Sequence, residues 1–140
     1  MKFYAVIDTN VLVSALLSNN SDAATVMVLQ SVENGEICPL IHEEILEEYE
    51  DVLGRAKFRL PSHLTHYVIQ KIKEVGLESG RVSTSENIPD GKDIVFYEVT
   101  LSKDDAYLIT GNKKHFPQKP IVVSPAEMMD ILTKNKADNQ

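Results

Sequence analysis

Short, wholly apolar runs alternate along the chain with longer segments in which apolar residues recur every three or four positions. The first apolar run covers residues 3–7 (FYAVI), Asp8-Thr9-Asn10 interrupts it, and a second apolar run reaches Leu17. A short run that is apolar throughout is typical of a strand buried on both faces, as in a parallel sheet. Asp, Thr and Asn begin helices because their side-chain oxygens accept unpaired N–H groups. The pattern therefore predicts a strand, a polar turn and a helix, with Asp8 at the carboxyl end of the strand.

Strands and helices alternate to the end of the chain. Further strands are predicted at 36–41, 106–110 and 120–123, and Pro39 should limit the pairing of the first of these. Apolar spacing and end residues predict further helices at about 21–32, 42–53, 61–75, 93–101 and 125–133. A short edge strand is predicted at 81–83, within a weakly patterned segment. This alternation predicts an α/β fold: a three-layer α/β/α domain with a mostly parallel central sheet.

Length and composition indicate one ordinary globular domain. With 140 residues, of which 43% are hydrophobic and 25% charged, the chain can bury a single core. We expect this domain to span 1–133 and the polar residues 134–140 to form a fraying tail. No apolar run approaches the roughly 20 residues that cross a membrane. Because the first predicted strand begins at residue 3, we expect no signal peptide. Because Cys38 is the only cysteine, we expect no internal disulfide and a cytoplasmic location.

The chain is acidic, with a formal net charge of −7 and a pI near 5.0. This balance argues against a protein that binds nucleic acid through a general basic surface. It fits an acidic metal site, or a chain that works beside a basic partner. Small basic groups occur at 55–59, 71–73 and 113–114, and solvated loops and helix faces are sufficient to explain them.

Acidic and amide side chains fall where strands end or helices begin. Asp8 and Asn112 each follow a predicted strand, while Asp90 and Asp93 precede and begin a predicted helix. Because the strand ends of a doubly wound sheet share one edge, Asp8, Asp93 and Asn112 could converge there. Glu48 must come in from a neighbouring helix.

Converging carboxylates indicate a divalent cation. Like charges repel, so such a cluster is unfavourable unless a cation neutralises it. Mg²⁺ and Mn²⁺ prefer carboxylate oxygens and water, and they often bridge to phosphate. The chemistry that this would support is hydrolysis of a phosphodiester by a metal-activated water, with no Ser, Cys or His nucleophile.

Each of these residues also has a purely structural interpretation. Asp8, Asn10 and Asp93 are common helix caps. Asp90 and Asn112 lie next to glycines and are typical of tight turns. Glu48 is one of several acids on its predicted helix, and most of these acids must face water. Spacing alone leaves both interpretations open.

Four segments, taken in order, resemble the motifs of the PIN-domain family. They are AVIDTNVLV at 5–13, ILEEY at 45–49, DGKD at 90–93 and YLITGN at 107–112. The resemblance runs from Lys2 to about Leu132 and points to the branch of toxins of toxin–antitoxin modules. It implies a single PIN-like nuclease domain with Mg²⁺- or Mn²⁺-dependent endoribonuclease activity on RNA. It also implies a homodimer that pairs with an antitoxin protein whose tail covers the active site.

The resemblance also assigns roles to individual residues. It implies that Asp8, Glu48 and Asp93 are catalytic and bind the metal, with Asp90 as the accompanying metal-binding acid. The residues implied to support them are Asn10, Thr9, Asn112 and Thr110. Contacts with the RNA backbone are predicted for a set of basic residues: Arg55, Lys57, Lys113 and Lys114.

Two features depart from the family pattern. Many members carry Asp where this chain has Asn112. An amide brings no charge, so we predict weaker binding of a second metal and lower activity. The segment at 101–105 is short and polar, which predicts a shortened helix before it and leaves the register of that helix with Asp93 open.

Two other functions compete with this interpretation. One is a degenerate, non-catalytic PIN module that binds RNA or a protein partner, with Asn112 marking decay of the site; the three acids argue against it. The other is an aspartyl-nucleophile phosphatase, which would need an acid in place of Asn10. The histidines are predicted to be surface or packing residues rather than zinc ligands: His42, His63, His66 and His115.

Overall fold

The first predicted strand lies at the centre of the sheet. In the computed structural model, β1 (Phe3–Ile7) pairs in parallel with β2 (Ile37–Ile41) and with β4 (Tyr107–Ile109). The edge strands β3 (Leu77–Glu78) and β5 (Val122–Val123) also pair in parallel, which gives the order β3-β2-β1-β4-β5. β1 and β2 have a strand on either side and helices on both faces, which explains why they are apolar throughout.

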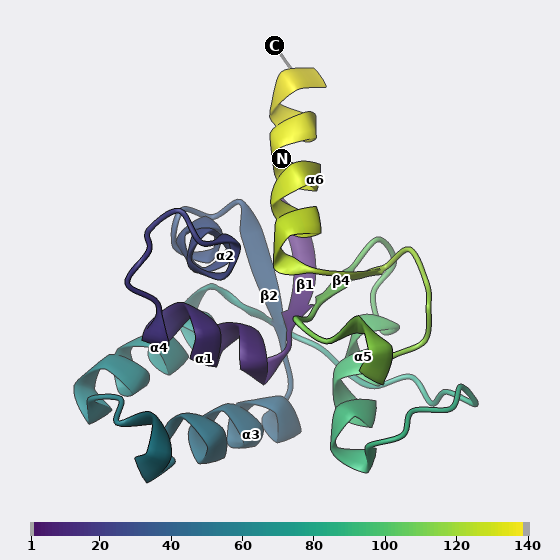
Figure 1. The fold of residues 1–140 in the computed structure, drawn as a ribbon. Helices are drawn as coiled ribbons and strands as arrows, with labels where there is room; N and C mark the ends of the chain where they lie inside the picture. The colour runs from purple at the N-terminus through teal and green to yellow at the C-terminus, as the bar shows by residue number, and fades with distance from the viewer. Residues whose placement is uncertain (1, 139–140) are drawn as a thin grey trace.

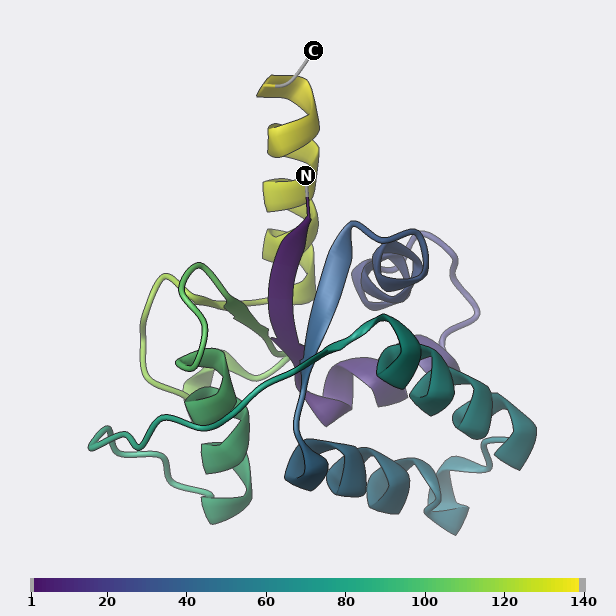
Figure 2. The same cartoon turned by 180° about the vertical axis from the view of Figure 1, so that it is seen from behind.

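Helices cover both faces of this sheet. The structure describes residues 2–138, and the helices there are α1 (Thr9–Leu17), α2 (Ala24–Glu33), α3 (Glu43–Leu53), α4 (Ser62–Val75), α5 (Ile94–Thr100) and α6 (Pro125–Asp138), with 3-10 turns η1 (Ala56–Phe58), η2 (Gly91–Asp93) and η3 (Lys113–His115). α2 and α6 pack together on one face, and α4 and α5 lie on the other (Figure 1 and Figure 2). α1 and α3 lie beyond the carboxyl ends of the strands. This arrangement confirms the predicted three-layer α/β/α fold. None of the described helices is long and apolar enough to cross a membrane.

The prediction of an edge strand at 81–83 is wrong. The strand at the β2 edge of the sheet is β3, a few residues earlier in the chain. Residues 81–83 lie against α5 instead. The Arg81 guanidinium is 2.6 Å from the Glu98 carboxylate, and Val82 N–H donates to the Glu98 carbonyl at 3.1 Å. Val82 is exposed, so its apolar side chain is not evidence of a buried strand. This segment is therefore held by an ion pair and a backbone hydrogen bond, and not by pairing with the sheet.

The last helix is longer than predicted. α6 continues through Asp138, so residues 134–138 are helical where the sequence predicts a fraying tail. Residues 139–140 of that tail lie outside the described residues. Lys136 Nζ lies 2.9 Å from Glu36 Oε2, just before β2. This contact ties the polar end of α6 to the sheet, which the local sequence pattern could not indicate.

Candidate active site

Asp8 lies at the carboxyl end of β1, where the path of the chain through the sheet reverses. From β1 the chain moves outwards to β2 and β3, and it then crosses to the other side of β1 for β4 and β5. Asp8 N–H donates to the Ile109 carbonyl of β4 at 2.9 Å, and the residue is only 6% exposed. In open α/β sheets, ligands bind at this switch point, outside the carboxyl ends of the strands.

Thr110 holds the Asp8 carboxylate in place. Thr110 Oγ1 donates to Asp8 Oδ2 at 2.8 Å and accepts from Asn112 N–H at 3.0 Å. Because Thr110 is completely buried, this hydroxyl links the end of β1 to the turn after β4. Burial raises the pKa of Asp8, whereas the Thr110 hydroxyl and the backbone N–H groups of Thr9 and Asn10 oppose the rise. Asp8 therefore has donors that favour its ionised form.

Tyr49 fixes α3 against the end of β1. Its buried ring packs beside Phe96, with ring centroids 6.5 Å apart, and its hydroxyl donates to the Ile7 carbonyl. Burial first, and the charge of Asp8 second, raise the pKa of Tyr49, so the hydroxyl stays protonated. The half-buried Glu48 precedes it on the helix, and its charge raises the pKa of Asp93. In the sequence, Tyr49 stands out only as the last residue of the ILEEY segment, and nothing there predicts the role of its hydroxyl.

The two acids of the D-x-x-D turn have different environments. Asp90 Oδ1 accepts from Lys92 N–H at 3.0 Å, so Asp90 caps η2. Asp93 directly precedes α5, which is short as predicted, but its side chain makes no capping hydrogen bond. Among the described residues, Asp93 Oδ2 is buried and has no hydrogen-bond partner. A buried carboxylate oxygen that accepts no hydrogen bond is unfavourable, and the His115 imidazole contacts it only at an ion-pair distance of 3.4 Å.

The acids act on one another through their charges. Burial, Asp8 and Asp90 raise the pKa of Asp93 to about 6, with a smaller contribution from Glu48, while His115 lowers it. The structure thus brings three of the predicted acids close enough to influence the carboxylate of the fourth, Asp93. A cation placed among them would relieve this repulsion.

His115 belongs to the same group of side chains, although the sequence predicts it to be a surface or packing residue. Its Nδ1 lies 3.4 Å from Asp93 Oδ2, and its Nε2 lies 3.0 Å from Asn112 Nδ2. The imidazole is 48% exposed, against 16% for the Asp93 side chain. No periodicity marks this histidine. Its one sequence signal is its position three residues after Asn112, about one helical turn away.

Two supporting residues remain predictions. Thr9 is buried, and within residues 2–138 its Oγ1 has no hydrogen-bond partner. Asn10 is exposed, and it acts on Asp8 through its backbone N–H. The predicted bracing of Asp8 by the Asn10 side chain is therefore not among the contacts that the structure describes.

The four basic residues predicted to contact RNA are all exposed. Arg55 pairs with an acid of α3 at 3.0 Å, and Lys113 pairs with Glu127 of α6 at 2.8 Å. Lys113 belongs to η3 together with His115, whereas Arg55 lies beyond the end of α3. The contact of these residues with RNA stays a prediction, as it does for the other two: Lys57 and Lys114.

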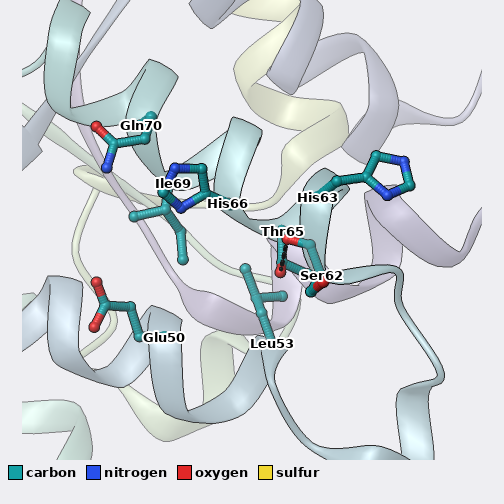
Figure 3. Close-up of a pocket in the computed structure, with 8 residues that line it drawn as sticks. All are labelled: Glu50, Leu53, Ser62, His63, Thr65, His66, Ile69 and Gln70. Carbon is teal, nitrogen blue, oxygen red and sulfur yellow. Dashed lines mark hydrogen bonds between the residues drawn. The ribbon is translucent and has the colours of Figure 1, made fainter.

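A pocket between α3 and α4 lies away from the acids. It has a volume of about 570 Å³ and is lined by Glu50, Leu53, Ser62, His63, Thr65, His66, Ile69 and Gln70 (Figure 3). None of the predicted site residues lines it. Figure 3 shows the rings of His63 and His66 turned in different directions, which is not the arrangement of two ligands on one metal ion.

The donors at the sheet edge fit a hard divalent cation. Within residues 2–138, no group of three or more His, Cys, Asp or Glu side chains is arranged to hold a metal ion. Mg²⁺, however, is commonly bound by one or two carboxylates together with waters and substrate phosphates. Asp8 and Asp93 bring two carboxylates to the sheet edge, and Asp93 Oδ2 is a buried oxygen that accepts no hydrogen bond within the described residues.

The fold and this site define a class of protein: an all-parallel α/β domain with carboxylates gathered at the switch point of its sheet. A family model described as PIN domain matches residues 4–114. The chain therefore belongs to the PIN domain family, which confirms the resemblance of its motifs. Comparison with curated proteins and with solved structures gave no match. The PIN domain is a nuclease-type fold, and its members typically use divalent metals.

Proposed function

We propose that this PIN domain is a Mg²⁺- or Mn²⁺-dependent endoribonuclease. The observation that carries the proposal is the buried Oδ2 of Asp93, which accepts no hydrogen bond within the described residues. Burial, together with Asp8 and other acids at the switch point of the sheet, raises the pKa of this carboxyl group. A divalent cation is the partner that satisfies this oxygen and relieves the repulsion.

Each acid has a distinct part in the proposed site. Asp8 and Asp93 would hold the cation, and the Thr110 hydroxyl would keep the Asp8 carboxylate oriented. Asp90 would add negative charge from the η2 turn, and Glu48 would orient the attacking water from α3. When bound, the cation would supply a Lewis acid and a water nucleophile at neutral pH.

An RNA phosphate suits this edge of the sheet in spite of the net charge of −7. The cation would neutralise the carboxylates locally, so the substrate need not meet a basic surface. Lys113 and Lys114, which share η3 with His115, would contact neighbouring phosphates, whereas Arg55 and Lys57 would meet a longer strand beyond α3.

The test is cleavage of a labelled single-stranded RNA by the purified protein in Mg²⁺, Mn²⁺ or EDTA. Cleavage should require the metal. Asp8→Asn and Glu48→Gln should each lower the rate by about 100-fold or more, since groups that only support a metal ligand are already worth roughly 10–100-fold. Glu47→Gln removes an exposed acid beside Glu48 on the same helix. It is the matched control and should keep the wild-type rate.

Two results would contradict the proposal in different ways. Cleavage that survives Asp8→Asn would place the chemistry elsewhere in the molecule or in a contaminant. Absence of cleavage at every metal concentration, with RNA or a protein partner still bound, would support the degenerate, non-catalytic PIN module instead.

We further propose that the nuclease is the toxin of a toxin–antitoxin module, acting in the cytoplasm as a homodimer that a cognate antitoxin inhibits. The support is the resemblance of four sequence motifs to that branch of the family. Expression of the wild-type chain should arrest growth, and Asp8→Ala should relieve the arrest at an equal protein level. Normal growth with an active nuclease would contradict the toxin role, and a monomeric mass by light scattering would contradict the homodimer.

A further inference from the structure

Asn112 and His115 form a chain of contacts that ends on the Asp93 carboxylate. His115 Nε2 lies 3.0 Å from Asn112 Nδ2, and His115 Nδ1 lies 3.4 Å from Asp93 Oδ2. Asn112 is anchored in turn, because its backbone N–H donates to Thr110 Oγ1, the hydroxyl that donates to Asp8. The imidazole is therefore held in a defined position relative to both central acids.

The separation of His115 from Asp93 is that of two donors on one metal ion. N–H···O hydrogen bonds span roughly 2.7–3.2 Å, and the 3.4 Å between Nδ1 and Oδ2 is longer. Within residues 2–138, Asp93 Oδ2 has no hydrogen-bond partner at all. Two donors that each lie about 2.1 Å from a cation, at octahedral or tetrahedral angles, are roughly 3.0–3.4 Å apart. A cation between these atoms would satisfy both.

Asn112 suits the role of orienting a metal-bound histidine. A ligating imidazole usually donates its other ring N–H to an oxygen acceptor. The Asn112 amide faces His115 Nε2 at 3.0 Å, and rotation of the amide by half a turn exchanges its nitrogen for its oxygen at that position. The amide can therefore accept the N–H of a metal-bound imidazole without adding negative charge to the site.

We propose that His115 is a nitrogen ligand of the divalent cation held by Asp8 and Asp93, with Asn112 as its positioning residue. The proposal rests on the metal-dependent function proposed above. The region matched by the PIN domain model ends at residue 114, so this ligand lies just outside it.

A nitrogen ligand changes which cation the site prefers. Mg²⁺ favours oxygen donors and water, whereas first-row transition-metal ions accept imidazole readily. The site should therefore bind Mn²⁺ more tightly than Mg²⁺. Loss of the imidazole should weaken Mn²⁺ binding much more than Mg²⁺ binding.

The test is pulsed electron paramagnetic resonance of Mn²⁺ bound to the purified full chain, which detects a directly coordinated imidazole nitrogen. The wild type should show nitrogen coupling. His115→Gln should abolish the coupling and, by calorimetry, weaken Mn²⁺ binding about tenfold or more. Asn112→Ala should weaken Mn²⁺ binding, and Asn112→Asp should restore it, because a carboxylate also accepts the imidazole N–H. His63→Gln removes a histidine of the α3–α4 pocket and should change neither reading.

The outcomes separate this inference from the proposed function. Mn²⁺ bound in an Asp8-dependent site without nitrogen coupling, or with coupling that His115→Gln retains, would overturn the inference and leave the nuclease proposal intact. Mn²⁺ binding that is absent, or that Asp8→Asn does not affect, would overturn both. Labelling the histidines with the heavier nitrogen isotope identifies the coupled atom in the wild type, so the test does not depend on the folding of a variant.

Discussion

At the scale of single residues, Asp8 and Asp93 differ in the hydrogen-bond donors that surround their carboxylates. Asp8 receives the Thr110 hydroxyl and faces backbone N–H groups, whereas Asp93 Oδ2 receives no hydrogen bond within the described residues. From the sequence, both could be interpreted as helix caps, and the neighbouring Asp90 could be interpreted as a turn residue. Asp90 does cap its turn through Lys92 N–H. Asp93 makes no such cap, so its carboxylate has no structural role of this kind, while metal binding by Asp90 stays a prediction.

Asp93 gives a pH-dependent prediction for the metal-free protein. Its folded-state pKa of about 6 lies above its ordinary value of 3.8, so folding favours the protonated acid. That stabilisation is fully present below about pH 4 and is lost as the pH rises through about 6. Asp93→Asn should therefore be more stable than wild type at pH 7, by on the order of 2 kcal/mol, and equally stable near pH 4.

Urea unfolding in EDTA at the two pH values measures this difference. Asp51→Asn alters an exposed carboxylate of α3, 68% exposed, and should differ from wild type by less than about 0.5 kcal/mol at either pH. Equal stability of Asp93→Asn and wild type at pH 7 would show that the Asp93 carboxylate carries no unrelieved charge.

The role of a single residue could be predicted from the sequence where the local sequence pattern itself indicates that role. Asp8 and Asp93 were identifiable because they follow a strand or begin a helix, and because their motifs resemble a known family. His115 was not, since its contact with Asp93 depends on how η3 turns after β4. The role of the Tyr49 hydroxyl was equally hidden, because a position on a helix does not say which buried acceptor a hydroxyl will reach. The family resemblance implied that Thr110 supports the acids, but not that its hydroxyl donates to Asp8.

At the scale of elements, the junction of α4 and β3 shows how closely the helical layer approaches the sheet. Gly76 ends α4, as predicted. A Cβ at this position would lie 2.6 Å from the Ile72 carbonyl oxygen, 2.9 Å from Ile41 Cγ2 and 3.0 Å from the Pro39 carbonyl oxygen. The glycine is therefore required by the lack of space between α4 and β2, and its φ of −79° is open to any residue.

Gly76→Ala should destabilise the protein by about 1–3 kcal/mol, because two of the groups it meets are backbone carbonyls that cannot rotate away. Gly80→Ala is the matched control, since nothing lies within 4 Å of its added Cβ. That substitution should be neutral or slightly stabilising, by up to about 1 kcal/mol. Thermal unfolding of the two variants measures both effects, and equal stability would show that α4 and β2 are not closely packed at Gly76.

Elements were predictable where a pattern is long enough to be seen. The buried strands and the amphipathic helices gave such patterns. β3 has only two residues, both exposed, so it carries no burial signal, and the exposed Val82 drew the prediction to the wrong place. Pro39 acted as expected: β3 pairs only with Leu40 and Ile41, which follow it in β2.

At the scale of the whole molecule, strand order brings the site together. Alternating strands and helices in the sequence predict a parallel sheet but do not give the order of its strands. The order β3-β2-β1-β4-β5 sets β1 beside β4, which is why Thr110 donates to Asp8 although the two are 102 positions apart. The convergence of the acids could be anticipated from the general geometry of such sheets and from the family resemblance. The distances within the group could not.

The central claim is that the carboxylates at this switch point hold a divalent cation. The most direct measurement is anomalous diffraction from crystals of the full chain soaked in Mn²⁺. The strongest peak should lie within about 2.5 Å of carboxylate oxygens of both Asp8 and Asp93, and it should disappear in crystals of Asp8→Asn. A strongest peak elsewhere on the molecule, or one at the sheet edge that persists in Asp8→Asn, would contradict the claim.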